Sequence, residues 1–148
     1  ISLGLDQPAL VADIPAARAL LDRALELDED FQRGALHAAF ITLESVGEAM
    51  GGSNTRAREH FERAVELSDG QDVAPYLSLA SGVAVSEENR DEFRDLLEIA
   101  IAIDSDEHPE NRLLNLIGQN RARLLREHID DLFFEPLNTL ELDEENRE

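Results

Sequence analysis

The stretch AREHFERAVELS (residues 57–68) decides the fold of this chain, because its pattern occurs twice more. The other two copies are ARALLDRALELD (17–28) and FRDLLEIAIAID (93–104). Each copy carries a bulky apolar residue at its fifth position, an alanine three residues later and an aliphatic residue three residues after that. Apolar residues at this spacing lie on one face of a helix. Each copy is therefore predicted to be an amphipathic helix whose alanine lets a neighbouring helix approach closely.

The distances between the copies predict stacked helix pairs. The equivalent alanines, Ala24, Ala64 and Ala100, are 40 and 36 residues apart, close to the period of about 34 residues of tetratricopeptide-type helix pairs. The three copies would be the second helices of their pairs. First helices are expected over residues 33–50, 74–85 and 109–130. We expect an all-α fold of tetratricopeptide-like antiparallel helix pairs that form an α-solenoid or helical bundle.

The two ends of the chain differ from the repeats. Residues 1–135 are expected to form one helical domain that lacks upstream helices, because too few residues precede the helix at 15–27 to form its partner. A solenoid helix without its partner exposes an apolar face, so we expect further helices or another subunit to cover it. The adjacent Phe133 and Phe134 are expected to close the other end. Residues 136–148 are expected to form an acidic tail.

Charge and composition exclude several classes of function. The formal net charge is −20 and all 13 basic residues are arginine. Nucleic acids and anionic membranes are bound through clusters of basic residues, so both are disfavoured as partners. The chain has no cysteine, which excludes disulfides, thiol catalysis and cysteine metal sites. No apolar run approaches the roughly 18–20 residues that a membrane-spanning helix requires.

The glycine pair in GGSNTRAREH (51–60) allows two interpretations. Glycines followed by Ser, Thr and two arginines at the start of a helix can cradle an anion, with Arg56 and Arg58 as its ligands. However, the chain has no lysine and no GK[ST] motif, and no strand precedes the glycines, so the phosphate-binding loop pattern fails. The favoured interpretation is a turn between two packed helices.

No pattern in the sequence indicates catalysis. The four histidines, at positions 37, 60, 108 and 128, are scattered and none belongs to an HExxH motif. Nucleophile elbows and dinucleotide-binding fingerprints are also missing from the sequence. We therefore expect a protein that is not an enzyme and that has no metal site, cofactor or catalytic residue.

The expected binding surface consists of residues on the first helices, which would line a concave groove or pore. His37, Phe40 and Glu44 share one face of a helix at spacings of 3 and 4. The alternative for His37 is a partly buried structural histidine. The complete set of candidate ligand- or partner-binding residues is His37, Phe40, Glu44, Tyr76, Asn115, Gln119 and Arg123.

The third of the predicted first helices, over residues 109–130, carries the most distinctive surface. One polar stripe is predicted on it, formed by Arg112, Asn115, Gln119, Arg123 and Arg126. The opposite side is a broad apolar face that is expected to pack against the domain, formed by Leu113, Leu116, Ile117, Leu124 and Leu125. In so acidic a chain, this basic and amide-rich stripe is a candidate binding surface for an anionic ligand or a charged partner. The alternative is that its arginines pair with the acidic ends of neighbouring helices.

Several of these segments together resemble the T-component proteins associated with TRAP-type transporters. The segments are DRALELDEDFQRGALH (22–37), GGSNTRAREHFERAVELSDG (51–70), APYLSLASGVAV (74–85) and RLLNLIGQNRARLL (112–125), the last followed by DDLFF (130–134). The resemblance runs from about residue 9 to residue 134 and preserves the order of the motifs. The acidic residues after Pro136 have no counterpart in it.

The resemblance implies a function in solute uptake. It implies a periplasmic lipoprotein that partners a TRAP-type solute-binding protein, forms a homo-oligomer, with a trimer favoured, and handles a small hydrophobic or organic-acid ligand. A signal peptide, a lipidated cysteine and further helices would precede the present chain in such a protein. The alternative is a cytosolic tetratricopeptide-type adaptor that binds a peptide or protein partner in its groove.

Overall fold

The computed structural model describes residues 12–133, and this part of the chain is built from helices without a strand. The α-helices are α2 (Ile14–Leu27), α3 (Ala35–Glu44), α4 (Asn54–Leu67), α5 (Val73–Leu79), α6 (Arg90–Ala102), α7 (Arg112–Glu127) and α8 (Ile129–Leu132). Short 3₁₀ segments, η1 (Phe31–Arg33) and η2 (Glu48–Met50), flank α3, and a π-helical segment, η3 (Ala80–Ala84), continues α5. The predicted all-α class is confirmed.

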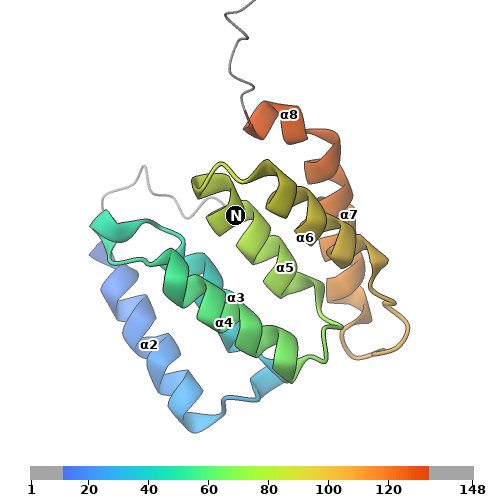
Figure 1. The fold of residues 1–148 in the computed structure, drawn as a ribbon. Coiled ribbons are helices and arrows are strands. Elements are labelled where there is room, and N and C mark those ends of the chain that lie inside the picture. The colour runs from blue at the N-terminus through green and yellow to red at the C-terminus, as the bar shows by residue number, and fades with distance from the viewer. Residues whose placement is uncertain (1–11, 134–148) are drawn as a thin grey trace, which may run out of the picture.

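Successive helices run up and down in one layered stack (Figure 1). Helix α3 packs on α4 and α5, and α5 packs in turn on α6 and α7. Helices α3 and α5 thus each contact the next helix and the next but one, which is the arrangement that stacked helix pairs produce. The tetratricopeptide-like subclass and the domain limits at 135 and 136 stay predictions, and those limits lie outside the described residues.

Two of the three repeated alanines are buried in the core. Ala64 of α4 and Ala100 of α6 are completely buried, whereas Ala24 of α2 is partly exposed. A fully buried Phe93 completes the core at the α6 end, with Phe133 against it at a ring-centroid distance of 5.2 Å and nearly edge-on. Phe133 therefore closes this end as predicted, while Phe134 lies outside the described residues.

The helix expected over 33–50 is shorter than predicted. Helix α3 ends at Glu44, and Gly47 then adopts φ 91° and ψ 155°, which a side chain would oppose. At Gly52 an added Cβ would lie 2.3 Å from the carbonyl oxygen of Glu44. Close backbone contact therefore requires glycine there. The glycine pair forms an inter-helix turn, as favoured from the sequence.

The arginines after this turn bind carboxylates of the protein itself. Nε of Arg56 donates to Glu44 at 3.0 Å, and Nη2 of Arg58 donates to Glu87 at 2.6 Å and to Glu92 at 2.9 Å. Both guanidinium groups are therefore paired with carboxylates of the protein. They are not available to bind an anion at this helix start, which was the alternative interpretation.

The helix expected to begin near Pro109 begins three residues later. Residues 104–111 form turns in which the backbone N–H of Asp106 donates to the side chain of Asp104 at 2.9 Å, and that of Asn111 donates to the carbonyl of His108 at 3.0 Å. Pro109 lies within these turns, so α7 begins only at Arg112. The local hydrogen bond to the Asp104 side chain competes with helix formation here.

Candidate functional site

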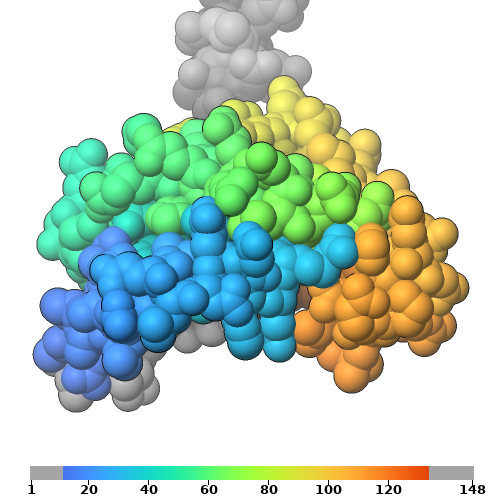
Figure 2. Space-filling model, turned by 90° about the horizontal axis from the view of Figure 1, so that it is seen from below, coloured from blue at the N-terminus to red at the C-terminus, as the bar shows by residue number. Residues whose placement is uncertain are grey.

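A groove of about 370 Å³ lies between α3, α5 and α7, on the side where the molecule is arched (Figure 2). Three first helices of the predicted pairs thus provide its walls, as expected for the concave side of stacked pairs. Its lining consists of Gln32, Arg33, Gly34, Ala35, Ala38, Asp72, Ala74, Pro75, Leu77, Asn111, Leu114, Asn115, Ile117, Gly118 and Arg121. A concave, mainly apolar site with a few polar groups is what a small-molecule site requires.

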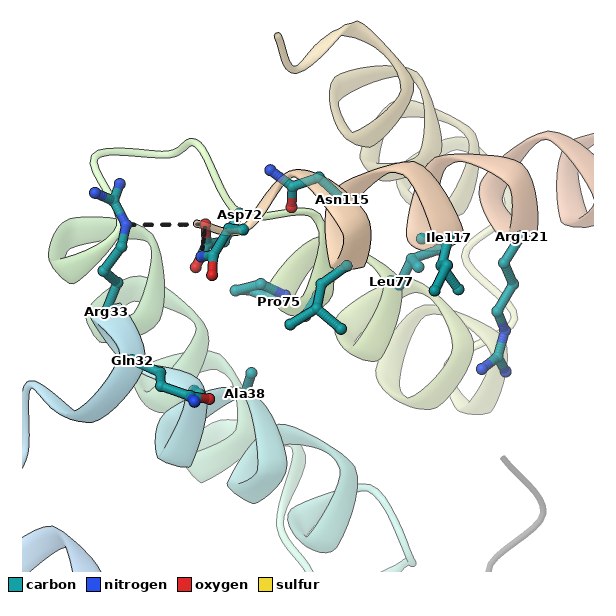
Figure 3. Close-up of a pocket in the computed structure, with 15 residues that line it drawn as sticks. Gln32, Arg33, Ala38, Asp72, Pro75, Leu77, Asn115, Ile117 and Arg121 are labelled. Carbon is teal, nitrogen blue, oxygen red and sulfur yellow. Dashed lines mark hydrogen bonds and ion pairs between the residues drawn. The ribbon is translucent and has the colours of Figure 1, made fainter. Parts of the chain in front are cut away.

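The apolar walls depend on close packing between α5 and α7. An added Cβ at Gly118 would lie 2.6 Å from Cγ1 of Val73, so only glycine lets the two helices approach this closely. In the lining of the groove, Ile117 of α7 lies next to Leu77 of α5 (Figure 3). Leu114 of α7 also lines the groove. Leu114 and Ile117 stay largely exposed to solvent, so this wall is open to a ligand.

One end of the groove is polar and internally bonded. Nη2 of Arg33 donates to the carbonyl of Ser68 at 2.5 Å, and its Nε lies 3.9 Å from a carboxylate oxygen of Asp72. The same carboxylate accepts a 2.7 Å hydrogen bond from the side-chain amide of Asn111. Asp72 therefore joins η1 to the start of α7 at this end of the groove (Figure 3).

The backbone beside this end is strained. Gln32 and Arg33 have φ of 45° and 57°, the left-handed region that residues with side chains rarely adopt. Each such position costs on the order of 1 kcal/mol. The conformation holds the Arg33 guanidinium between Asp72 and the end of α4, where its Nε is buried without a hydrogen-bond partner among the described residues.

The other end of the groove carries an unpaired cation. Among residues 12–133, Arg121 contacts no carboxylate, and neither do Arg123 and Arg126. The nine other arginines of this region each contact an acidic side chain. In a chain of net charge −20, a cation left unpaired at the rim of an apolar groove is free to bind an anionic group.

The comparisons with known proteins match the resemblance seen in the sequence. The profile of the TRAP transporter T-component family matches residues 1–133. This chain belongs to the TRAP transporter T-component family. It is also 30% identical over 128 residues to an uncharacterized protein of Treponema pallidum (strain Nichols), covering 86% of this chain and 40% of that protein. The chain therefore spans well under half the length of this relative.

Of the seven candidate residues in this T-component, Asn115 alone lines the groove. His37, Phe40 and Glu44 face α4 instead. Nδ1 of His37 lies 2.8 Å from Nδ1 of His60, and the Phe40 ring stacks on His60 at a centroid distance of 4.6 Å. Glu44 is 1% exposed and binds both Arg18 and Arg56.

The remaining candidates lie apart from one another. Tyr76 is buried with its ring edge-on to Phe61 at 5.4 Å. Gln119 is buried and its amide donates to the carbonyls of Ile101 and Ile103, at 3.2 and 2.7 Å. Arg123 is exposed on α7. The structure thus does not bring the seven residues into one site, and their role in binding stays a prediction.

The predicted orientation of α7 was wrong. Leu113, Ile117 and Leu124, expected to pack inward, are 68%, 60% and 51% exposed. Of the predicted polar stripe, Asn115 and Gln119 are buried, whereas Arg112, Arg123 and Arg126 are exposed. Asn115 accepts from the N–H of Val73 at 3.0 Å and donates to the carbonyl of Gln71 at 2.8 Å. These are backbone groups at the start of α5, and Gln119 does the same for carbonyls at the end of α6. Helix ends leave such groups unpaired, and the α7 amides satisfy them.

Sequence reasoning missed four groove residues, Arg33, Asp72, Asn111 and Arg121. The first three are joined across separations of 39 residues, which no local spacing reveals. Arg121 is distinguished by the lack of an acidic partner among the described residues, a property of the folded chain. A small residue such as Gly118 in an otherwise regular helix was the one usable signal, because it marks close helix packing.

Burial and neighbouring charges around α3 shift the pKa values of three ionisable groups, His37, His60 and Glu44. Burial lowers the pKa of His37 and of His60 below the ordinary value, which favours their neutral forms. Burial alone would raise the pKa of the Glu44 carboxyl, but hydrogen bonds and charge from Arg18 and Arg56 outweigh it, and the net direction is down. Glu44 is therefore a buried carboxylate with two cationic partners, which is a structural arrangement.

Proposed function

We propose that this T-component is a non-enzymatic binding component of a TRAP-type solute uptake system, with its ligand in the groove between α3, α5 and α7. The observation that carries the proposal is the combination of an apolar groove with the unpaired Arg121 at its rim. An apolar wall of Leu77, Leu114 and Ile117 suits a hydrocarbon body, and a free guanidinium suits a carboxylate. The ligand class is therefore a small hydrophobic organic acid.

The groove offers binding groups and no catalytic constellation. Its polar atoms within the described residues are guanidinium and amide groups and the Asp72 carboxylate, which is engaged with Arg33 and Asn111. Catalysis by a nucleophile requires a base within hydrogen-bond reach of it, and the lining contains no such pair. A holding or transfer role fits these groups.

The partner and assembly we propose follow from membership of the family. An extracytoplasmic TRAP-type solute-binding protein is the proposed partner, and a homo-oligomer, with a trimer favoured, is the proposed assembly. The proposed location is the periplasm, with a lipid anchor on the full-length protein. Among residues 12–133, no helix has both the length and the apolar character that crossing a membrane requires. Helix α2 has no buried residue, and its Leu20 and Leu27 are exposed, which supports contact with further protein.

Calorimetric titration of the chain with octanoate, and with 1-octanol as its uncharged counterpart, tests the ligand class. We expect octanoate to bind and Arg121→Gln to weaken it about tenfold or more, because a hydrogen bond to a charged group is worth roughly 1.5–3 kcal/mol. The matched control is Arg94→Gln, which changes a partly exposed arginine on α6 that pairs with Asp91, and it should bind octanoate normally. Equal binding of the acid and the alcohol, or an unchanged Arg121→Gln, would contradict an organic-acid groove.

Native mass spectrometry with the solute-binding protein of the same organism tests the partner. A defined homo-oligomer and a stoichiometric complex are expected. A chain that stays monomeric and ignores the solute-binding protein would overturn the transport role and favour the alternative, a cytosolic adaptor that binds a peptide or protein partner.

A further inference from the structure

The polar end of the groove has a carboxylate oxygen without a hydrogen bond. Oδ1 of Asp72 accepts the 2.7 Å hydrogen bond from the Asn111 amide and is also the atom that lies 3.9 Å from Nε of Arg33. Among residues 12–133, no donor is bonded to the second oxygen, Oδ2. The Asp72 side chain is 13% exposed and lines the groove (Figure 3). A ligand in the groove can therefore bond to Oδ2.

The Asp72 carboxylate is available because the helix that follows does not use it as a cap. Asp72 occupies the N-cap position of α5 (Val73–Leu79), yet its side chain makes no capping bond. An N-cap aspartate usually accepts from the N–H of the second or third helical residue. The third helical residue here is Pro75, which has no N–H, and the N–H of Val73 is bonded to Asn115.

The chemistry at this end of the groove suits a neutral hydrogen-bond donor. Arg33 already balances the charge of Asp72, so a further cation is not required. A further anion finds no free donor in Arg33, because its terminal nitrogens face the Ser68 carbonyl at 2.5 Å and Nδ1 of His108 at 3.2 Å, and its Nε is buried. A hydroxyl group donates one hydrogen bond without adding charge. A hydroxyl is therefore the group that fits Oδ2.

The apolar middle of the groove separates this oxygen from Arg121. Leu77 and Ile117 lie between the two ends (Figure 3). The position of Asn111, whose amide binds Asp72, is ten residues before that of Arg121, which corresponds to about 15 Å along a helix. An extended chain advances about 1.3 Å per bond. A ligand of about twelve carbons therefore spans the groove from one end to the other.

We propose that the ligand of the groove is an ω-hydroxy acid of about twelve carbons, with its carboxylate on Arg121 and its hydroxyl donating to Oδ2 of Asp72. Asp72 is then the residue that selects the far end of the ligand, because it accepts from a hydroxyl and repels a second carboxylate. This inference rests on the proposed function and adds the second functional group of the ligand.

Calorimetric titration with dodecanoate, ω-hydroxydodecanoate and dodecanedioate, each below its micelle-forming concentration, tests the inference. The hydroxy acid should bind about tenfold more tightly than dodecanoate, because it adds a hydrogen bond to a charged group. Dodecanedioate should bind more weakly than dodecanoate, since its second carboxylate meets that of Asp72. If dodecanoate binds through Arg121 but the hydroxy acid has no advantage, this inference is overturned and the proposed function stands. Binding of none of the three would overturn both.

The variant Asp72→Asn should reverse the ranking. Asn111 requires an acceptor, so the remaining oxygen stays with it and the new N–H groups take the place of Oδ2. Dodecanedioate should then gain about tenfold, and ω-hydroxydodecanoate should lose most of its advantage, because bonds to charged groups are the stronger ones. The matched control Asp95→Asn changes an exposed carboxylate on α6 and should keep the wild-type ranking.

Two results would overturn the role of Asp72. One is an Asp72→Asn ranking unchanged from wild type, and the other is an equal loss of affinity for all three ligands. The wild-type ranking is measured without any substitution and decides the ligand class by itself.

Discussion

Nδ1 of His37 lies 2.8 Å from Nδ1 of His60, so the two imidazoles of α3 and α4 share at most one proton between them. His37 also faces Glu29, whose carboxylate is 3.4 Å from its other ring nitrogen, and His60 stacks on Phe40. Two imidazolium groups at this separation would repel each other across the α3–α4 contact. Protonation of both histidines would therefore weaken the packing of α3 on α4.

Acidification should destabilise the fold through this pair. Burial lowers the pKa of both histidines below 6.5, so the unfolded chain binds protons that the native chain does not. Stability is then complete above pH about 6.5 and falls as the pH drops from there toward the lowered pKa values, by at most about 1.4 kcal/mol per pH unit for each histidine. Urea unfolding of wild type and His60→Gln at pH 7.5 and 5.5 measures this loss.

The loss between the two pH values should be smaller in His60→Gln than in wild type. The matched control is His128→Gln, because His128 is exposed and its ring nitrogen lies 2.8 Å from the carbonyl oxygen of Leu124, the residue four positions before it. If His60→Gln and His128→Gln lose stability equally on acidification, the pair has no special role.

Removing the charge of Glu44 should weaken the junction of α2, α3 and α4. Its carboxylate is buried and holds Arg18 and Arg56, so Glu44→Gln leaves both arginines without their carboxylate partner. We expect a loss of about 2–3 kcal/mol, below the figure for fully buried pairs because the arginines are partly exposed. Urea unfolding measures it, with Glu66→Gln as a control that should stay within about 0.5 kcal/mol. Similar losses for both would refute this role of Glu44.

Asn115 should contribute to the stability of the fold, whatever it contributes to ligand binding. Its side chain satisfies the N–H of Val73 and the carbonyl of Gln71, and Asn115→Ala leaves both unpaired in a buried place. The expected loss is about 1–3 kcal/mol of unfolding free energy. Asn120→Ala, on the exposed side of the same helix, is the control. A fully stable Asn115→Ala with weakened ligand binding would support the original prediction of a binding residue instead.

Gly118 should tolerate no side chain while Val73 is present. Alanine there would overlap the Val73 side chain, at 2.6 Å from Cγ1, at a cost of about 1–3 kcal/mol, partly offset by the roughly 1 kcal/mol that alanine gains over glycine in a helix. Gly118→Ala should lower the thermal midpoint, and Val73→Ala should then cost less in the double variant than alone. Additive effects in this cycle would show that the two residues do not clash.

Much of the architecture was predictable from the spacing of a few residues. Ala64 and Ala100 are buried at helix contacts, Phe133 closes the end of the stack, and the glycines at 51 and 52 form a turn. These features depend on local rules, namely the periodicity of a helix and the conformational freedom of glycine. The family was predictable too, because its motifs keep their order along the chain.

The candidate site was much less predictable. The lining of the groove joins Arg33 to Asp72 and Asp72 to Asn111 across distant parts of the chain. Of the seven residues chosen from the sequence, Asn115 alone reached that lining. His37 and Glu44 were correctly seen as a pair on one helix face, but that face meets α4.

By itself the sequence determined the helices, their order and the family, because hydrophobic periodicity acts within one segment. Only the tertiary structure decided which way α7 faces. Its periodicity defines an apolar side and a polar side, and burial of leucines would favour turning the apolar side inward. The unpaired backbone groups at the start of α5 and the end of α6 instead bind Asn115 and Gln119, because a buried polar group without a partner is costly. Leu113, Ile117 and Leu124 are left outside, where they form the outer face of α7.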